Sequence, residues 1–326
     1  MLKYYAKWKD LALRTLESEV LNVKKCEDAE LVVVSGMGGS GIVGDYLSSL
    51  ADETGKYPVF VVKDFSIPKW IDSSRTFIVS ISYSGETLET IKAFTYVSDL
   101  AKCIGVVTSD GKLADLAKSY SVPLLLLERG YVPRAAFPAL LFGTFKLLHE
   151  VGIDILPLDI VKRSVNAIDI DRAKSISEKL ASFLVTSKYP LIVAPWKYRA
   201  LAIRFKNELN ENSKVPAKVE VIPELFHNDI VGWEQKKFAD KAILITGSNS
   251  MNKELVEFYR GFLEDVGFET FVLKLEGEDY LQELLYGTLC AGVASVLLAS
   301  ELGVDPLKTR SISSYKKFLG KLVSSA

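Results

Sequence analysis

The chain has 326 residues, 48% of them hydrophobic, and this length provides for two ordinary domains with a core in each. Its 40 lysine and arginine residues balance 41 aspartate and glutamate residues, which excludes a broad nucleic-acid interface because such a surface needs an excess of basic side chains. Only two histidines and three cysteines occur, and no carboxylates are spaced as ligands, so the sequence predicts no metal ion and no other cofactor.

Short apolar runs alternate with helical patterns in the first half of the chain. The predicted strands are 31–35, 59–62, 77–81, 104–108 and 123–127. The predicted helices begin near residues 4, 40, 86, 113 and 134. Strands that alternate with helices in this way are typical of a parallel sheet covered on both faces.

The pattern pauses at 152–159 and then resumes, so we expect two domains, 1–152 and 153–326. In the second domain the predicted strands are 191–194, 218–222, 242–246 and 270–275. The predicted helices are about 160–185, 197–211, 251–266 and 279–301. The fold class is therefore α/β, with two stacked units of similar size that indicate an old duplication.

One stretch, 284–300, contains no charged residue. It is short for a membrane span, which takes about 20 apolar residues, and it contains Gly287, Thr288 and Gly292. We therefore predict a buried helix and no membrane contact. The N-terminus lacks the apolar core of a signal peptide, and the cysteines form no CxxC pair, so we expect a reducing cytoplasm without disulfides. Cys103 and Cys290 are expected to pack in the core.

The first polar motif is a glycine-rich turn after a strand, with Gly36, Gly38 and Gly41 in a GxGxxG-like run. Glycines let backbone amides approach an anion, and the helix that follows supplies free N–H groups. A dinucleotide is disfavoured because Lys63 stands where the second strand would end in an acidic residue. A turn that serves packing alone is the other interpretation of this motif.

The second motif, residues 77–87, is again a strand, a turn and a helix start, and it presents Ser82, Ser84 and Thr87 together. Three hydroxyls around a helix N-terminus form a donor site for a phosphate monoester. Ordinary helix capping would explain one of them, but not all three. Because no Gly-Lys-Ser/Thr follows, this turn is not a nucleoside triphosphate loop.

These motifs resemble the sugar isomerase (SIS) domain, and the whole chain resembles the archaeal-type bifunctional phosphoglucose/phosphomannose isomerases. The segments that carry the resemblance are 36–41 (GMGGSG), 80–87 (SISYSGET), 133–137 (PRAAF), 206–212 (KNELNEN) and 223–230 (PELFHNDI). The resemblance implies two tandem SIS domains, each a doubly wound parallel sheet flanked by helices. It further implies a homodimer with its active sites at the subunit interface.

The implied activity interconverts glucose 6-phosphate and mannose 6-phosphate with fructose 6-phosphate through a cis-enediolate. Such a reaction needs a base over C1 and C2 and donors near O1 and O2. By resemblance Glu211 is the base, although spacing alone does not choose between Glu211 and Glu208. His227 falls on the family's ring-opening histidine, which enters the site from the partner subunit, whereas His149 is expected to be structural.

Arg134 follows a proline at a predicted helix start, and a guanidinium that never loses its proton can stabilise the enediolate. A surface ion pair is the alternative. Lys316 matches the family's C-terminal lysine that assists ring opening, but the adjacent Lys317 leaves that choice open. Thr309 resembles the family's small residue that leaves room at C2 for either epimer. The predicted substrate-binding residues are Gly39, Ser40, Ser82, Ser84, Thr87 and Thr309.

Three other functions are weighed against this one. A phosphoglucose isomerase that rejects mannose 6-phosphate would share the same motifs. A non-catalytic SIS-domain sensor of sugar phosphates would have no need for Glu211, His227 and Arg134 together. The isomerase half of glucosamine-6-phosphate synthase would be accompanied by a glutaminase domain with an N-terminal cysteine, and the chain shows neither.

Overall fold

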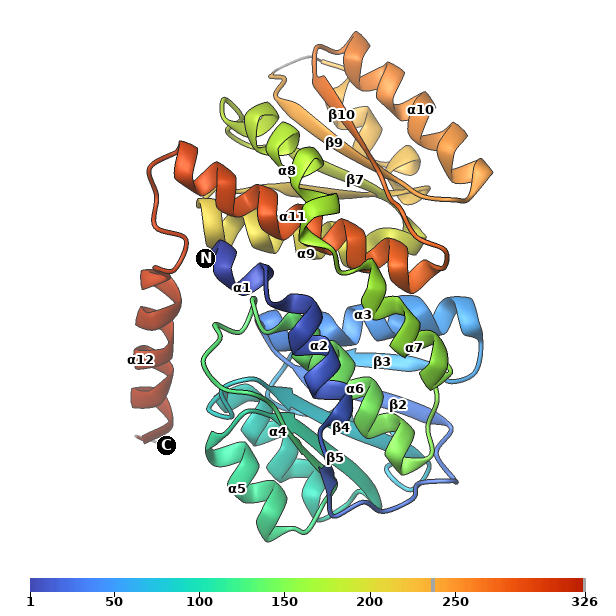
Figure 1. Cartoon of the computed structure of the whole chain (residues 1–326), viewed down its shortest axis with the longest axis vertical. Helices are drawn as coiled ribbons and strands as arrows, with labels where there is room; N and C mark the ends of the chain where they lie inside the picture. Colours follow the sequence, from blue (N-terminus) through green and yellow to red (C-terminus); the bar gives the residue numbers. More distant parts are fainter. Residues whose placement is uncertain (236–237, 325–326) are drawn as a thin grey trace.

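The computed structural model describes residues 1–235 and 238–324. Two β-sheets lie one above the other, with helices between them and on their outer faces (Figure 1). The last helix, α12 (Arg310–Ser324), stands beside the rest of the molecule and runs down along the lower sheet. The α/β fold class with mainly parallel sheets is confirmed.

The first sheet contains six strands in the order β1-β6-β5-β4-β2-β3. Their bounds are β1 Val20–Leu21, β2 Leu31–Gly36, β3 Val59–Val62, β4 Thr76–Ser82, β5 Cys103–Thr108 and β6 Leu124–Leu126. All pairs are parallel except β1 with β6. The five longer strands match the predicted ones, and β1 was missed because two residues show no periodicity.

The second sheet contains four parallel strands in the order β10-β9-β7-β8. Their bounds are β7 Leu191–Pro195, β8 Lys218–Ile222, β9 Lys241–Thr246 and β10 Glu269–Lys274. All four were predicted. Because β7 and β9 are neighbours although β8 lies between them in the chain, the strand order reverses at this point, as in other doubly wound sheets.

The helices of the first half are α1 Leu2–Tyr5, α2 Trp8–Glu17, α3 Gly38–Thr54, α4 Leu88–Ser98, α5 Gly111–Ser119 and α6 Phe137–Val151. Those of the second half are α7 Leu158–Ser164, α8 Ile170–Leu184, α9 Arg199–Glu208, α10 Ser250–Asp265 and α11 Tyr280–Glu301. The helix predicted over 160–185 was wrong as one element. A 3₁₀ turn, Val165–Ala167, follows α7, and Asp169 then caps α8 by accepting hydrogen bonds from the N–H groups of Asp171 and Arg172.

Alternate residues of each strand face different clusters of the core. In β2, Val33 belongs to the cluster under α4 and α5, whereas Val32 and Val34 belong to the largest cluster. That largest cluster continues from one sheet to the other and takes in most of α11. The molecule therefore shares one core between its two sheets, and the division at residue 152 stays a prediction.

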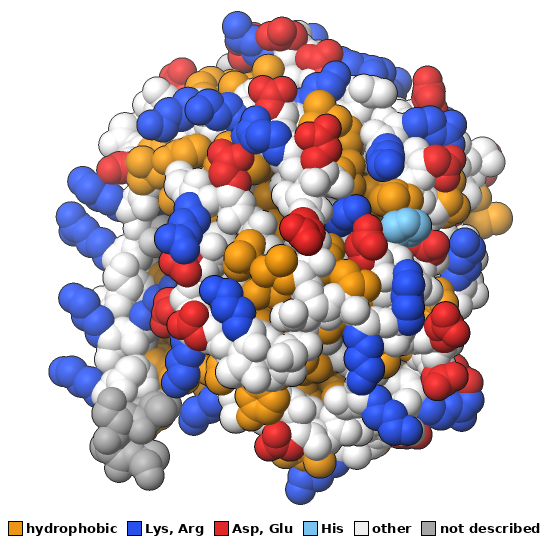
Figure 2. Space-filling model, turned by 60° about the horizontal axis from the view of Figure 1, so that its bottom comes forward, with side chains coloured by type: hydrophobic (Ala, Val, Ile, Leu, Met, Phe, Trp, Pro, Cys, Tyr) orange, Lys and Arg blue, Asp and Glu red, His pale blue; other side chains and the backbone are white. Residues whose placement is uncertain are grey.

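The buried helix predicted from the uncharged stretch is confirmed. Within the described residues α11 is the one helix long and apolar enough to cross a membrane, and 89% of its apolar window is buried inside the molecule. Its side chains fill the space between the sheets, where Gly287 meets Leu201 and Gly292 meets Tyr5. The visible face mixes acidic and basic side chains, apart from a row of basic side chains along one edge (Figure 2).

The expectation of no disulfide was wrong. Cys26 and Cys103 form one, with their Cα atoms 5.9 Å apart. Cys103 begins β5, one residue before the predicted strand 104–108, and Cys26 lies in a loop that comes close to it. The two cysteines are 77 positions apart in the sequence, so their proximity cannot be seen from the sequence alone. Cys290 is free and buried, and burial raises its pKa to about 12. The disulfide removes the cysteine argument for a reducing compartment.

Candidate active site

The two glycine-rich turns lie side by side at the carboxyl edge of the first sheet. β2 and β4 are parallel neighbours, and Gly36 pairs with Ile81 at their ends. Gly38 begins α3 with a φ of +52°, and a Cβ on Gly41 would lie 2.5 Å from the carbonyl oxygen of Gly36. The sequence thus makes a tight turn possible here, and Gly38 at the start of α3 is exposed.

The predicted phosphate hydroxyls are held in a local hydrogen-bond network. Ser40 Oγ accepts from the backbone N–H of Tyr83 at 3.0 Å, which ties the first turn to the second. Ser82 Oγ donates to Thr87 Oγ1 at 3.0 Å, and Ser84 Oγ accepts from the N–H of Glu86 at 3.3 Å. Thr87 stands at the N-cap of α4, yet its hydroxyl does not cap the helix. Simple capping therefore does not account for these residues.

Arg134 lies next to the first turn. A Cβ on Gly39 would be 3.1 Å from the backbone nitrogen of Arg134, so the start of α3 and residue 134 are in close contact. The predicted helix start near 134 is a turn instead, and α6 begins at Phe137 with a proline in its first turn. Arg134 is consequently a loop residue, with a side chain only 6% exposed.

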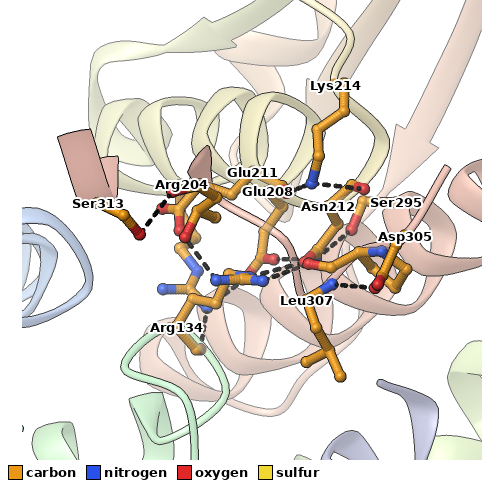
Figure 3. A network of polar contacts seen from close by, with 12 residues as sticks. Arg134, Arg204, Glu208, Glu211, Asn212, Lys214, Ser295, Asp305, Leu307 and Ser313 are labelled. Carbon is orange, nitrogen blue, oxygen red and sulfur yellow. Dashed lines mark hydrogen bonds and ion pairs between the residues drawn. The ribbon is translucent and has the colours of Figure 1, made fainter. Parts of the chain in front are cut away.

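The guanidinium of Arg134 faces Glu211 (Figure 3). Its Nη1 lies 3.1 Å from Glu211 Oε2, its Nε donates to Asn212 Oδ1 at 2.7 Å, and its Nη2 donates to the carbonyl of Pro306. The surface ion pair considered from the sequence does not describe this buried arrangement. Burial raises the pKa of Glu211, against the opposing effect of Arg134, while the nearby Glu208 raises it further.

Glu208 lies in a different environment from Glu211. It is 1% exposed and accepts hydrogen bonds from Tyr5 Oη at 2.8 Å, Asn212 Nδ2 at 2.7 Å and the guanidinium of Arg204. Arg204 also donates to the carbonyl of Arg134 at 2.6 Å. Glu208 is therefore enclosed within the protein, while the side chain of Glu211 is 27% exposed.

The chain changes its winding between these glutamates. The helix predicted over 197–211 continues as α9 only to Glu208, and a π-helical turn follows over Leu209–Ser213. Lys214 ends the turn with a φ of +60°, and its Nζ donates to the carbonyl of Glu211 at 2.5 Å. Burial lowers the pKa of Lys214. Single π turns are frequent at functional sites, but their sequences carry no simple signal.

A pocket of about 860 Å³ opens beside this turn. Glu211 and Lys214 line one part of it, and a second part comes from the segment Gly303 to Ile312, which includes Thr309 and runs from the end of α11 into the first turn of α12. The predicted residues Glu211 and Thr309 thus share one pocket. Lys214 and Asp305 also line it, and our sequence reasoning missed both.

The predicted phosphate-binding residues at the two turns do not line this pocket, and neither do His227 and Lys316. His227 ends a short 3₁₀ turn, Glu224–His227, with an exposed side chain that makes no hydrogen bond or ion pair to the described residues. Lys316 and Lys317 are exposed on α12 and do not line the pocket. Basic side chains project along the edge of the molecule above the grey C-terminal residues (Figure 2).

One hydrogen bond connects α12 to α4, and one pair at the end of α6 involves His149. Tyr315 Oη of α12 donates to Glu89 Oε1 at 2.7 Å, which connects α12 to the first turn of α4. His149 pairs with Asp154 at 2.8 Å, at the end of α6.

Comparison with known proteins decides the family. A family model described as the bacterial phospho-glucose isomerase C-terminal SIS domain matches residues 173–319. The bifunctional phosphoglucose/phosphomannose isomerase of Aeropyrum pernix is 33% identical over 92% of this chain and 92% of its own. The chain belongs to the bifunctional phosphoglucose/phosphomannose isomerase family. Within that family the protein of Aquifex aeolicus is 31% identical over 89% of this chain and 90% of its own.

One of the relatives is named for a different activity. The solved structures that match the chain share its fold. A D-glucosamine-6-phosphate 4-epimerase of Sulfolobus acidocaldarius is 29% identical over 96% of this chain and 95% of its own. The C-terminal domain of glucosamine-fructose-6-phosphate aminotransferase from Francisella tularensis superposes with a TM-score of 0.71. Its identity is 15%, over 94% of this chain and 96% of that chain. At this identity the likeness concerns the fold alone.

Proposed function

We propose that this protein is an aldose–ketose isomerase that interconverts glucose 6-phosphate and mannose 6-phosphate with fructose 6-phosphate. The observation that carries the proposal is the pair formed by Glu211 and Arg134, a carboxylate with a raised pKa beside a fixed guanidinium, in a chain that belongs to this family. A general base works best when its pKa lies near the pH of the reaction, and burial moves a glutamate in that direction.

The proposed mechanism moves the C2 proton to C1, and a second proton passes from the C2 hydroxyl to the oxygen on C1, so that the aldehyde becomes an alcohol and C2 becomes the ketone. Glu211 removes the proton from C2 of the open-chain aldose and returns it to C1, through a cis-enediolate. Arg134 stabilises the negative charge that develops on the oxygens, because its charge is permanent and its position is fixed. Glu211 is the better candidate for the base, since it lines the pocket while Glu208 is enclosed by protein donors.

The remaining predicted residues have supporting roles in this proposal. The phosphate group binds at the two turns at the sheet edge, where backbone N–H groups and hydroxyls offer neutral donors. Thr309 leaves room at C2, and Lys316 or Lys317 assists ring opening. The residues proposed to bind the phosphate are Gly39, Ser40, Ser82, Ser84 and Thr87.

We further propose that the active unit is a homodimer in which His227 enters the partner's site to open the sugar ring. The isolated position of His227 in its own chain supports this proposal, since a ring-opening group would have to approach from another subunit. We also propose that the enzyme works without a metal ion. The described residues contain no group of three or more metal-ligating side chains placed to hold one. The cytoplasm remains the proposed compartment because a charged hexose phosphate does not cross a membrane unaided.

The decisive experiment measures fructose 6-phosphate formed from glucose 6-phosphate and from mannose 6-phosphate, each with and without EDTA. We expect product from both aldoses and no effect of EDTA. Product from glucose 6-phosphate alone would reduce the activity to phosphoglucose isomerase. Binding without turnover would favour a sensor, and inversion at C4 of glucosamine 6-phosphate in a parallel incubation would favour the epimerase activity.

A further inference from the structure

Asn212 lies between two charged pairs, at the end of the π turn (Figure 3). It is fully buried, with 0% exposure. Its Oδ1 accepts from Arg134 Nε at 2.7 Å, and its Nδ2 donates to Glu208 Oε2 at 2.7 Å and to Ser295 Oγ at 2.9 Å. A reversed amide would point its N–H groups at the N–H of Arg134 and its oxygen at the Glu208 carboxylate, so these partners fix the orientation of the amide.

The Nδ2 group of Asn212 is bound to Glu208, which is itself held by other buried side chains. Glu208 accepts from Tyr5 of α1 and from Arg204 of α9, and both donors are 1% exposed. Arg204 also stacks over the ring of Phe137, with 4.8 Å between the guanidinium carbon and the ring centre. Buried polar networks hold their side chains in one arrangement when their groups are paired. Both carboxylate oxygens of Glu208 have partners here, whereas Nε of Arg204 has none among the described residues.

The Oδ1 atom of Asn212 restricts the orientation of the Arg134 guanidinium. A guanidinium is a planar fork, so holding two of its nitrogens fixes the third. Nε is bound to Asn212 and Nη2 to the carbonyl of Pro306, which leaves Nη1 directed at Glu211. Without Asn212 the fork could rotate about its long side chain and leave the carboxylate.

We infer that Asn212 is a positioning residue, which holds the guanidinium of Arg134 in the plane that serves Glu211 and the developing enediolate. Glu208 then holds the amide of Asn212 in place and is not the general base. This inference rests on the proposed isomerase activity and adds a specific role within it for a residue that touches neither substrate nor reacting atoms.

The first test compares Asn212→Leu with the wild type in both isomerase reactions. We expect kcat to fall by about a hundredfold, the effect of misplacing a catalytic group by about 1 Å, with little change in KM. The matched control is Ser213→Ala, since Ser213 is 1% exposed in the same π turn and bonds only to the carbonyl of Leu209. That control is expected to keep the wild-type kcat.

A pH profile separates positioning from a merely structural role. The charged groups that act on Glu211 are Arg134, Glu208 and Arg204, and of these Arg134 has the largest influence. Lys214, which lines the same pocket, also interacts with Glu211 and is unchanged in every variant of this test. If Arg134 retreats in Asn212→Leu, the pKa of Glu211 rises further and the acid limb of kcat/KM moves to higher pH. Loss of packing alone would leave that limb in place.

A double-mutant cycle with Arg134→Lys completes the test. Lysine has no Nε to be held, so Asn212→Leu should have little further effect on kcat in that background. Circular dichroism checks folding, and Asn212→Ser, which leaves room for water, takes the place of a leucine variant that does not fold. Additive effects, or an Asn212 variant with the kcat and pH profile of Ser213→Ala, would overturn the inference while the isomerase function stood. An inactive wild type would instead overturn the proposed function.

Discussion

Glu208 and Glu211 show how three positions of sequence can separate two carboxylates chemically. Both glutamates belong to the same continuous helical segment. Glu208 is enclosed by Tyr5, Arg204 and Asn212, whereas Glu211 faces a pocket. Glu208 ends α9, whereas Glu211 lies within the π turn that follows, so the winding of the chain changes from one glutamate to the other. Spacing could not choose the base, because a regular helix would have placed both on nearly the same face.

The first prediction concerns the base itself. Glu211→Gln should lower turnover by at least about a hundredfold, the low end for a positioned general base, because the amide cannot accept the C2 proton. Binding of a phosphorylated competitive inhibitor, measured by calorimetry, should change little. Glu208→Gln is the matched comparison: an inactive Glu208→Gln beside an active Glu211→Gln would show that the base is misassigned.

The raised pKa of Glu211 also predicts a pH dependence of stability. A carboxyl with a pKa above its unfolded value is favoured in its protonated form by the fold, so its contribution to stability is present at low pH and is lost as pH rises through the raised pKa. Glu211→Gln should therefore melt no lower than the wild type at neutral pH, and any advantage should vanish in acid. A lower melting temperature at neutral pH alone would mean that the ion pair with Arg134 outweighs burial.

At the scale of elements, the contribution of the turn after β4 to substrate binding can be measured. Ser84→Ala and Thr87→Ala should each raise KM by the equivalent of about 1.5–3 kcal/mol, the usual range for a hydrogen bond to a charged group. Ser98→Ala is the control, because Ser98 ends the same helix α4 and bonds only to the carbonyl of Thr95. Equal affinity for glucose and glucose 6-phosphate would contradict the phosphate assignment.

The disulfide joins the loop before β2 to the start of β5, away from the pocket. Replacing both cysteines, in Cys26→Ser/Cys103→Ser, should lower the free energy of unfolding by about 2–4 kcal/mol, since the bond restrains the unfolded chain. Urea unfolding gives that free energy, and the intact mass of the unreduced wild type verifies the bond. The kcat should stay at the wild-type value. A loss of activity in a folded variant would connect this edge to the site.

The elements were predictable where local patterns determine them. Apolar runs such as 77–81 gave nine of the ten strands, because strands buried on both faces read as continuous hydrophobic segments. The site was predictable only through motifs such as 206–212, which carry Glu211. Contacts between distant segments were not: nothing near Cys26 indicates Cys103, and nothing near Arg134 indicates the carbonyl of Pro306. These proximities arise from the fold of the whole chain.

At the scale of the whole molecule, the proposed dimer predicts that two inactive variants can complement each other. Equal amounts of Glu211→Gln and His227→Ala, mixed and allowed to exchange subunits, should recover about a quarter of native activity. Random pairing in closed two-fold dimers makes half of the dimers mixed, and each mixed dimer holds one intact site of two.

The matched negative control mixes Glu211→Gln with Arg134→Ala. Because Glu211 and Arg134 form their ion pair within one chain, a mixed dimer of these variants contains no intact site and should stay inactive. Native mass spectrometry confirms the exchange in both mixtures. No recovery with His227→Ala after confirmed exchange would place each complete site within a single chain.

The pocket is lined by two segments that are far apart in the sequence and are therefore synthesised at different times. The turn of Glu211 is made well before the segment from Gly303 to Ile312, which lines the second part of the pocket. A nascent chain on the ribosome, or one cut short before residue 303, carries the glutamate and the arginine without that second segment. The pocket that we propose for sugar phosphates is therefore incomplete until residues 303–312 have been synthesised.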